Sequence, residues 1–233
     1  MIKKAAKIFE EIIPLPAWCM SCEAFVPNAT SPYLCATCAK KLPRWYEGIC
    51  LSCGHVHQMG DCEENWALAL NSFTSVFGYL DPVKAWVAKF KYGGNLNAGR
   101  LLRELLKEYF RLHPSLTQEA DLIIPVPSHP SKLTKRGFNV PSFLLDIKGL
   151  RINMTAVQKT KSTQTQASLH QKERVSNLYQ AFSANTTEVA GKRILVFDDV
   201  CTTGRTLEEM AITLKRAGAT HVDALVLARV VMG

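Results

Sequence analysis

The stretch RILVFDDVCTTGRT, residues 193–206, constrains the fold of this chain more than any other part of its sequence. Four apolar residues, 194–197, run directly into two neighbouring carboxylates, Asp198 and Asp199, and then into a turn rich in threonine. An uninterrupted apolar run of this kind is typical of a strand that is buried on both faces of a parallel sheet. Because a helical pattern follows at 206–219, the stretch predicts a strand, a turn and a helix in succession.

The same alternation of apolar strands and helices recurs along the chain after about residue 69. Strands are expected at 72–80, 121–128, 193–197 and 221–231. Helices are expected from Pro82, with Asp81 as the N-cap, to the Gly93–Gly94 pair, and at 97–112, 139–148 and 206–219. Continuous apolar strands that alternate with helices favour a parallel sheet covered on both faces. The predicted fold class is therefore α/β.

The two acids are expected at the carboxyl end of their strand, the edge at which parallel sheets bind ligands. The helix start that follows offers backbone N–H groups to an anion, and Gly204 permits a close approach. Carboxylates accept hydrogen bonds from hydroxyls or hold a cation. A sugar phosphate satisfies both halves, with its diol on Asp198 and Asp199, which we take as the catalytic residues. Its phosphate would contact the rest of the stretch: Val200, Cys201, Thr202, Thr203, Gly204, Arg205 and Thr206.

Cys201 lies inside this turn and has two interpretations. A helix N-terminus lowers the pKa of a thiol, which would make Cys201 a reactive group. The alternative, which we favour, is a small spacer between the strand and the residues that bind phosphate.

Paired cysteines near the N-terminus predict a metal site. Cys19, Cys22, Cys35 and Cys38 form a C-x2-C-x12-C-x2-C array, in which two knuckles complete a tetrahedron around zinc. The start of the chain has no long apolar core and does not resemble a signal peptide; residues 1–13 show the spacing of a short amphipathic helix. We therefore expect a cytoplasmic protein, in which such thiols bind a structural zinc rather than form disulfides.

Three further thiolates follow the array: Cys50, Cys53 and Cys62. A fourth cysteine at the same spacing would fall at position 65, which is Asn65. Three interpretations remain open: a second zinc completed by His57, which we favour, a second zinc completed by His55, or no second metal. Pairing across the knuckles is a further alternative, so the sequence predicts one or two structural zinc ions.

The positive charge of the chain is unevenly distributed. Residues 1–70 hold six basic and seven acidic residues, whereas residues 71–233 hold 22 basic and 13 acidic residues, a net charge of +9. Such a charge suits a polyphosphate ligand or nucleic acid, although it also promotes solubility. No segment approaches the roughly 20 apolar residues of a membrane span.

Two segments between the predicted elements are rich in groups that suit phosphate. Pro127 and Ser128 follow a buried strand and, with Lys135 and Arg136 nearby, suit a pyrophosphate; a structural turn with solvated cations is the alternative. Residues 157–174 are rich in glutamine and cations and almost free of apolar residues, which is typical of a mobile loop.

The stretch ILVFDDVCTTGRT resembles the ribose-5-phosphate signature of type I phosphoribosyltransferases. Further motifs resemble the ComF family of phosphoribosyltransferase-like competence proteins, which includes the protein called GntX. They are FKYGGN (90–95), PVPSHPSKLTKRGFN (125–139) and QASLHQKERVSNLYQAF (166–182). The chain departs from the family pattern at Asn65 and at Lys159 and Lys161, where arginines are usual; lysine keeps the charge but loses the bidentate grip.

The resemblance implies a type I phosphoribosyltransferase domain at 69–233, preceded at 1–68 by a helix and a cysteine-rich zinc ribbon. It implies that phosphoribosyl pyrophosphate binds with Mg²⁺, and that ribose 5-phosphate is transferred to an acceptor that the sequence does not identify. The segment 157–174 would be the lid, with Lys159, Lys161 and Arg174 contacting the substrate.

Three classes of function follow. The first is an active phosphoribosyltransferase linked to competence. The second is a non-catalytic protein that keeps the sugar-phosphate pocket and acts with single-stranded DNA and DNA-processing proteins during uptake. The third, a purely structural adaptor, is disfavoured because the acids and hydroxyls of the signature are intact.

Overall fold

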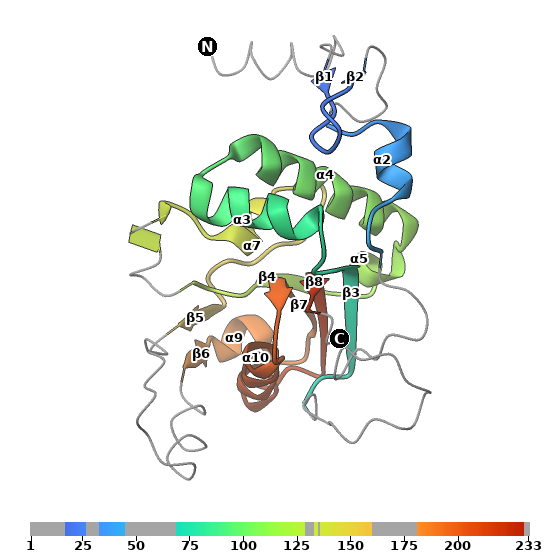
Figure 1. The fold of residues 1–233 in the computed structure, drawn as a ribbon. Helices are drawn as coiled ribbons and strands as arrows, with labels where there is room; N and C mark the ends of the chain where they lie inside the picture. Colours follow the sequence, from blue (N-terminus) through green and yellow to red (C-terminus); the bar gives the residue numbers. More distant parts are fainter. Residues whose placement is uncertain are drawn as a thin grey trace, which may run out of the picture. The chain divides into compact units, whose positions relative to one another are not determined.

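The computed structural model describes residues 17–26, 33–44, 69–128, 133–134, 136–159 and 181–230. Contacts divide the chain into two compact units, residues 1–43 and 44–233, and Figure 1 follows the chain through both. The predicted domain boundary after residue 68 and the helix predicted at 1–13 depend on segments outside the described residues, so both stay predictions.

A parallel sheet of four strands forms the centre of the second unit, in the order β3–β8–β7–β4. These strands are β3 (Ser72–Gly78), β4 (Leu122–Pro125), β7 (Arg193–Cys201) and β8 (His221–Arg229). Ile152 adds an isolated parallel bridge to Ile123 of β4. The apolar run 194–197 is at most 1% exposed, so the predicted buried strand is confirmed.

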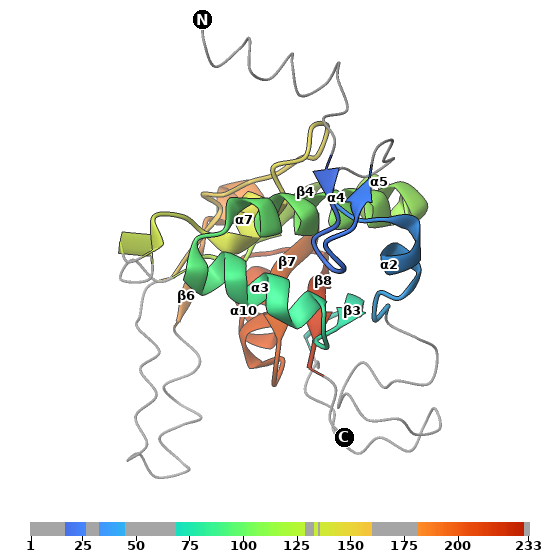
Figure 2. The same cartoon turned by 45° about the horizontal axis from the view of Figure 1, so that its top comes forward.

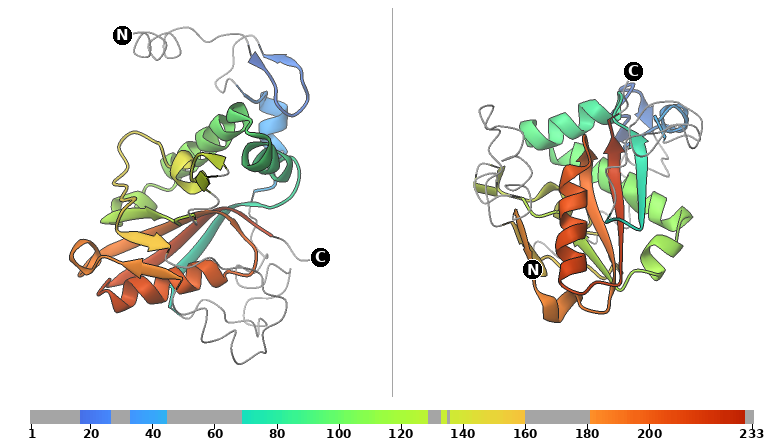
Figure 3. Two further views of the ribbon diagram at one scale, coloured as in Figure 1. Left: turned by 90° about the vertical axis from the view of Figure 1, so that its left-hand side faces the viewer. Right: turned by 90° about the horizontal axis from the view of Figure 1, so that it is seen from below.

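Helices cover both faces of this sheet, as Figures 1 and 3 show. On one face α10 (Arg205–Arg216) packs against β7 and β8. On the other face lie α3 (Val83–Gly93), α4 (Leu96–Leu112) and α7 (Val140–Leu144). Figure 2 shows α3 and α4 side by side, in agreement with their contacts. The predicted α/β fold with a doubly covered parallel sheet is confirmed.

Short elements connect the main ones. They are α5 (Ser115–Gln118), α9 (Thr186–Val189), β5 (Val157–Lys159) and β6 (Phe182–Ala184). The two strands β5 and β6 pair antiparallel, with Lys159 opposite Phe182. Most of the lid predicted at 157–174 lies outside the described residues, which exclude 160–180.

The junction of α3 and α4 follows from its sequence. Gly94 ends α3 in the left-handed region at φ 63°, a conformation that glycine adopts without strain. Asn95 then caps α4, since its side chain accepts a hydrogen bond from the N–H of Ala98 at 3.0 Å. The predicted N-cap of α3 is wrong: Pro82 takes that position, and no side chain caps the helix start.

The helix predicted at 139–148 is also wrong in length, because α7 ends at Leu144. Its start is as expected, with Pro141 in the first turn and the side chain of Asn139 accepting from the N–H of Ser142. Gly149, at φ 94°, lies in the turn that follows and leads the chain toward Ile152 beside β4.

The first unit is small and holds little regular structure. Strands β1 (Ala17–Trp18) and β2 (Phe25–Val26) pair antiparallel, and α2 (Ala36–Lys40) follows. The turn between the strands includes Glu23 in the left-handed region, at φ 59°. Cys19 lies directly after β1, and Cys35 is the N-cap of α2.

Candidate functional site

The two acids lie within β7, which continues four residues beyond the predicted strand. The sequence places the strand end at residue 197 because the apolar run stops there, whereas pairing with β8 continues to Cys201. Asp198 is half-buried and Asp199 is 5% exposed. Both nevertheless belong to the carboxyl edge of the sheet, where ligands of such folds bind.

A cavity of about 210 Å³ opens at this edge. Eight residues predicted from the sequence line it together: Pro127, Ser128, Arg136, Lys159, Asp198, Asp199, Val200 and Thr206. They come from the loop after β4, the segment before α7, the end of β5, β7 and the first turn of α10. The fold therefore brings three distant parts of the sequence, 127–136, 159 and 198–206, to one site.

Asp199 is held in place by an ion pair and a hydrogen bond. The Nζ atom of Lys91, in the last turn of α3, lies 2.5 Å from its Oδ2 atom. The other oxygen, Oδ1, accepts a hydrogen bond from the N–H of Val200 at 3.0 Å. Burial alone would lower the pKa of Lys91, but the carboxylate of Asp199 raises it above its ordinary value. The ion pair therefore favours the ammonium form of Lys91.

The ionised form of the Asp198 carboxyl is disfavoured by its surroundings. Burial raises its pKa well above the ordinary value for an aspartate, and the neighbouring carboxylate of Asp199 raises it further. Its Oδ1 atom accepts a hydrogen bond from the N–H of Asp199 at 2.8 Å, and Lys91 also favours its ionised form. Two adjacent acids with one lysine, paired with Asp199, form a site that gains from a further cation or from hydroxyl donors.

The turn from β7 into α10 has the backbone that the sequence predicts for an anion site. Gly204 is buried and left-handed, at φ 75°, directly before the first residue of α10. Thr202, Thr203 and Arg205 are exposed to solvent and do not line the cavity, whereas Thr206 does. The N-terminus of α10 is therefore directed at the same edge as the acids.

Cys201 is buried and 3% exposed. Burial raises the pKa of its thiol to about 11, although the nearby Arg229 acts in the opposite direction. A reactive thiol needs a lowered pKa. The structure therefore favours the spacer interpretation of Cys201, and this residue is not among those lining the cavity.

The cavity also includes residues to which sequence reasoning gave no role: Lys91, Tyr92, Val126, Val140 and Pro141. Lys91 and Tyr92 lie in the FKYGGN motif, so that motif was the available signal. Tyr92 is 80% exposed, and the guanidinium of Arg136 lies over its ring, 5.8 Å from the centroid. Three other predicted residues, Lys135, Lys161 and Arg174, lie outside the described part of the chain.

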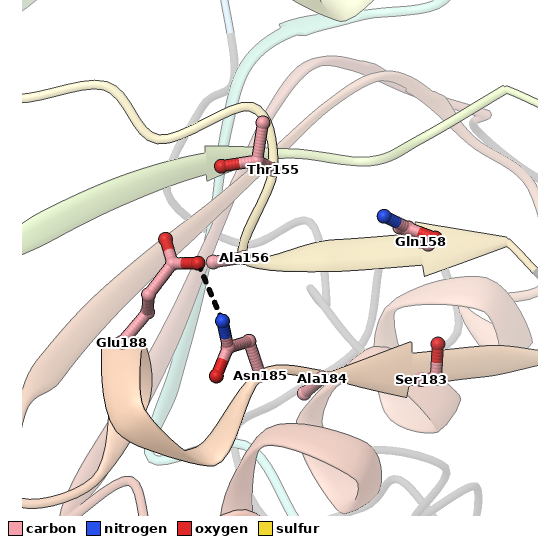
Figure 4. A pocket seen from close by; sticks show the side chains of 7 residues that line it. All are labelled: Thr155, Ala156, Gln158, Ser183, Ala184, Asn185 and Glu188. Atoms are coloured by element: carbon pink, nitrogen blue, oxygen red, sulfur yellow. Dashed lines mark hydrogen bonds between the residues drawn. The ribbon is translucent and has the colours of Figure 1, made fainter.

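A larger hollow, of about 360 Å³, lies elsewhere and has a different character. Figure 4 shows its lining, which includes Gln158 of β5, Ser183 of β6 and Glu188 of α9. The carboxylate of Glu188 accepts hydrogen bonds from the side-chain amides of Asn153 and Asn185. None of the predicted site residues lines this hollow, and its one acid is occupied by structural contacts.

The cysteine array of the first unit fits a single metal ion. The sulfurs of Cys19, Cys22, Cys35 and Cys38 all lie within 4.8 Å of one another. A tetrahedral zinc with bonds of about 2.3 Å places its sulfurs about 3.8 Å apart, and the Cys22 and Cys35 sulfurs are separated by 3.8 Å. These four cysteines can therefore hold one structural zinc. The candidate ligands of a second zinc, Cys50, Cys53, His57 and Cys62, lie outside the described residues.

Comparison with known proteins agrees with this geometry. A family model described as "Phosphoribosyl transferase domain" matches residues 95–230. Competence protein F of Haemophilus influenzae is 30% identical over 217 residues, which cover 84% of this chain and 90% of that protein. The chain belongs to the ComF family.

Other relatives of this ComF-family protein match over most of their length. The DNA utilization protein YhgH of Escherichia coli O6:H1 is 30% identical over 235 residues, covering 94% of this chain and 99% of that protein. Competence protein ComFC of Streptococcus pneumoniae is 24% identical over 200 residues, covering 84% of this chain and 87% of that protein.

Within the described ranges, no helix has both the length and the apolar character needed to cross a membrane.

Proposed function

We propose that this ComF-family protein binds phosphoribosyl pyrophosphate with Mg²⁺ and transfers ribose 5-phosphate to an acceptor. The observation that carries the proposal is the shared cavity. It joins Asp198 and Asp199 to the first turn of α10 and to three cations, Lys91, Arg136 and Lys159. These groups match the parts of the ligand. The acids can accept hydrogen bonds from the ribose hydroxyls, the start of α10 can bind one phosphate, and the cations can bind the other phosphates.

Each part of the cavity has a role in this proposal. Asp198 and Asp199 accept hydrogen bonds from the two ribose hydroxyls. The backbone around Gly204, with Thr202, Thr203 and Thr206, binds the 5′-phosphate. The loop at Pro127–Ser128, with Lys135 and Arg136, receives the pyrophosphate, and Lys159, Lys161 and Arg174 contact it from the lid.

The residues present fit Mg²⁺, which prefers carboxylate oxygens and the phosphates of a substrate as ligands. Burial and the neighbouring carboxylate of Asp199 raise the pKa of Asp198, and such a cation relieves the repulsion between the two acids. Asp198 and Asp199 would hold the metal together with the substrate. When bound, Mg²⁺ supplies charge neutralisation for the departing pyrophosphate.

Catalysis by these residues consists of positioning and charge stabilisation. The bond between the ribose C1 and the pyrophosphate oxygen breaks, and its electron pair leaves with pyrophosphate. The lone pair of the acceptor forms the new bond to C1, and the acceptor gives up a proton to solvent. The acids hold the ribose while positive charge develops on it, and Arg136 and Lys159 stabilise the leaving group.

The names of the relatives support a link to DNA uptake, since they include competence and DNA utilization proteins. The net charge of +9 on residues 71–233 suits single-stranded DNA as a partner. The same two observations favour a second candidate, a non-catalytic DNA-uptake protein that keeps the pocket. The paired cysteines Cys19, Cys22, Cys35 and Cys38 are arranged as metal ligands, and the cytoplasm remains the location that we propose for the protein.

Calorimetry tests the first candidate. The purified protein is titrated with phosphoribosyl pyrophosphate in the presence and absence of Mg²⁺, and pyrophosphate release is then measured with a panel of acceptors. We expect saturable binding that requires Mg²⁺. Release of pyrophosphate with any acceptor supports the enzyme; binding without release with any acceptor favours the second candidate, and no binding contradicts both.

A further inference from the structure

Lys91 lines the cavity, but the proposed function assigns it to no particular group of the ligand. Its ammonium pairs with Asp199 at 2.5 Å, and the side chains of the two residues are only 19% and 7% exposed. In the proposed complex, Asp199 receives a ribose hydroxyl and shares a cation. An ammonium with little access to water needs an anion in that complex as well, because an unpaired buried charge is strongly destabilising.

We propose that Lys91 changes partner when the ligand binds, leaving Asp199 for the pyrophosphate group. This inference rests on the proposed function and adds Lys91 to it as a substrate-binding residue. Lys91 neutralises Asp199 before binding and neutralises the leaving group afterwards.

The position of Lys91 in α3 suits such a change of partner. It lies in the last turn of the helix, two residues before Gly93, where the helix dipole favours a cation. The lysine side chain is a point charge on a long flexible stem, which makes few geometric demands on its partner. A Cβ atom added at Gly93 or Gly94 would meet nothing within 4 Å, so the helix end borders open space.

The pyrophosphate, rather than the 5′-phosphate, is the anion on the Lys91 side of the site. The next residue, Tyr92, lies beneath the guanidinium of Arg136, which belongs to the segment proposed for pyrophosphate. The turn proposed for the 5′-phosphate belongs instead to α10, which packs on the opposite face of the sheet from α3.

The charges of the cavity agree with this exchange. Two acids and three cations line it among the described residues, so an ion pair within the site leaves cations available to a ligand. Phosphoribosyl pyrophosphate carries several negative charges and so offers Lys91 a second anion, while the ribose hydroxyl and the shared cation of the proposed complex replace Lys91 as partners of Asp199.

The experiment separates this role from simple neutralisation of Asp199. Asp199→Asn is made first, so that removal of the lysine leaves no lone buried carboxylate. Binding of inorganic pyrophosphate and of ribose 5-phosphate, each with Mg²⁺, is then measured by calorimetry for Asp199→Asn and for Asp199→Asn with Lys91→Met. Lys89→Met in the same background is the matched control, because Lys89 is exposed on the same helix.

We expect Lys91→Met to weaken pyrophosphate binding about tenfold or more in this background, because the variant loses one hydrogen bond to a charged group. Ribose 5-phosphate binding should stay unchanged, and Lys89→Met should alter neither. Equal pyrophosphate binding by the single and double variants overturns the inference and leaves the proposed function intact. If the wild-type protein binds neither phosphoribosyl pyrophosphate nor pyrophosphate, the proposed function and this inference both fail.

Discussion

Asp198 and Asp199 form the residue pair on which the proposed function depends. Successive side chains of a strand point to opposite faces, yet both of these acids line one cavity at the end of β7. The raised pKa of Asp198, which burial and Asp199 cause, means that the folded protein bears a cost for keeping this charge. Among the described residues, Asp198 has no salt bridge of its own. A buried carboxyl with a raised pKa and no such partner is typical of a functional site.

We therefore expect Asp198→Asn and Asp199→Asn each to weaken binding of phosphoribosyl pyrophosphate roughly 10- to 100-fold, the loss of one charged hydrogen bond. Asp198→Asn should leave the melting temperature unchanged or raise it, because asparagine removes a charge that burial disfavours. Calorimetry and thermal unfolding measure the two effects.

Asp146→Asn is the control for these variants, since the Asp146 side chain is 81% exposed and pairs only with Arg103 among the described residues. It should change neither binding nor stability appreciably. If both active-site variants unfold while ligand binding survives in the folded remainder, the acids are scaffold residues instead.

The sequence identified these acids but not Lys91, for a physical reason. The two acids are adjacent in sequence to the threonine-rich turn that follows β7. The sequence of this one stretch is therefore enough to identify them. Lys91 is separated from Asp199 by more than a hundred residues, and only the packing of α3 beside the carboxyl edge of the sheet brings the two together. Contacts of this kind depend on tertiary structure and leave little trace in local sequence.

At the scale of elements, α10 connects the site to two other segments. Its first residue follows the left-handed Gly204 of the phosphate turn. Glu208 accepts hydrogen bonds from the N–H of Ala69, at 2.9 and 3.2 Å, where the chain enters the sheet domain. Glu209, 8% exposed, accepts a hydrogen bond from the N–H of Ala181 at 2.9 Å, directly before β6. The first turns of α10 therefore hold both of these chain segments through backbone hydrogen bonds.

Glu209 gives this region a dependence on pH. Burial raises its pKa above the ordinary value, while the N–H of Ala181 and the charge of Lys159 act in the opposite direction. The folded protein thus holds this proton more tightly than the unfolded chain. The stability that results is fully present below the unfolded pKa, about 4.3, and is lost as the pH rises through the folded pKa.

Glu209→Gln stays neutral and should therefore gain stability relative to the wild-type protein as the pH rises through that window. Urea midpoints measured over a series of pH values test the prediction. Glu119→Gln, at a side chain that is 65% exposed, provides the comparison. A constant difference between Glu209→Gln and the wild type at every pH would show that burial of this carboxyl has no such effect.

Elements were predicted best where apolar periodicity was strong. The strand at 193–197 was located correctly but ended too early, because polar residues can continue a ladder that a neighbouring strand supports. The helix predicted at 139–148 was too long, since after Leu144 the N–H groups of Asp146 and Ile147 bond to nearer carbonyls, those of Phe143 and Leu145, and no longer continue the helical pattern. The strands β5 and β6 were missed because each has only three residues, and their pairing joins segments more than twenty residues apart.

At the scale of the molecule, we expect the first unit to depend on zinc. The unit is small, and none of the residues of α2 is buried. We therefore expect metal binding to stabilise its folded state more than apolar burial does. A structural zinc contributes on the order of 10 kcal/mol to such a module. We expect one or two zinc ions per chain, and Cys19→Ser or Cys38→Ser should remove one of them and unfold the first unit.

Metal analysis and circular dichroism measure these effects. Cys201→Ala is the control, because Cys201 is buried in the second unit and should leave the zinc content unchanged. His57→Ala decides the second site: a lower zinc count identifies His57 as a ligand. A metal-free preparation in which the first unit stays folded would show that the thiols are not a zinc site.

The α/β class and the order of the main elements followed from sequence because both depend on patterns that repeat over the whole chain. The functional role of the +9 charge does not follow in the same way, since net charge alone does not distinguish a partner from solubility. The salt dependence of binding makes that distinction, because each phosphate contact releases counterions.

We expect the protein to bind a fluorescent oligothymidylate at about 50 mM salt, with an affinity that falls steeply as salt increases, by a slope of about −0.7 on logarithmic axes for each phosphate contacted. Fluorescence anisotropy over a salt series measures this slope. Asp198→Asn should leave DNA binding intact while weakening phosphoribosyl pyrophosphate, because a nucleic-acid surface depends on basic residues rather than on the ribose acids. Binding that is absent at low salt, or insensitive to salt, would mean that the positive charge of residues 71–233 serves the phosphate ligand and solubility alone.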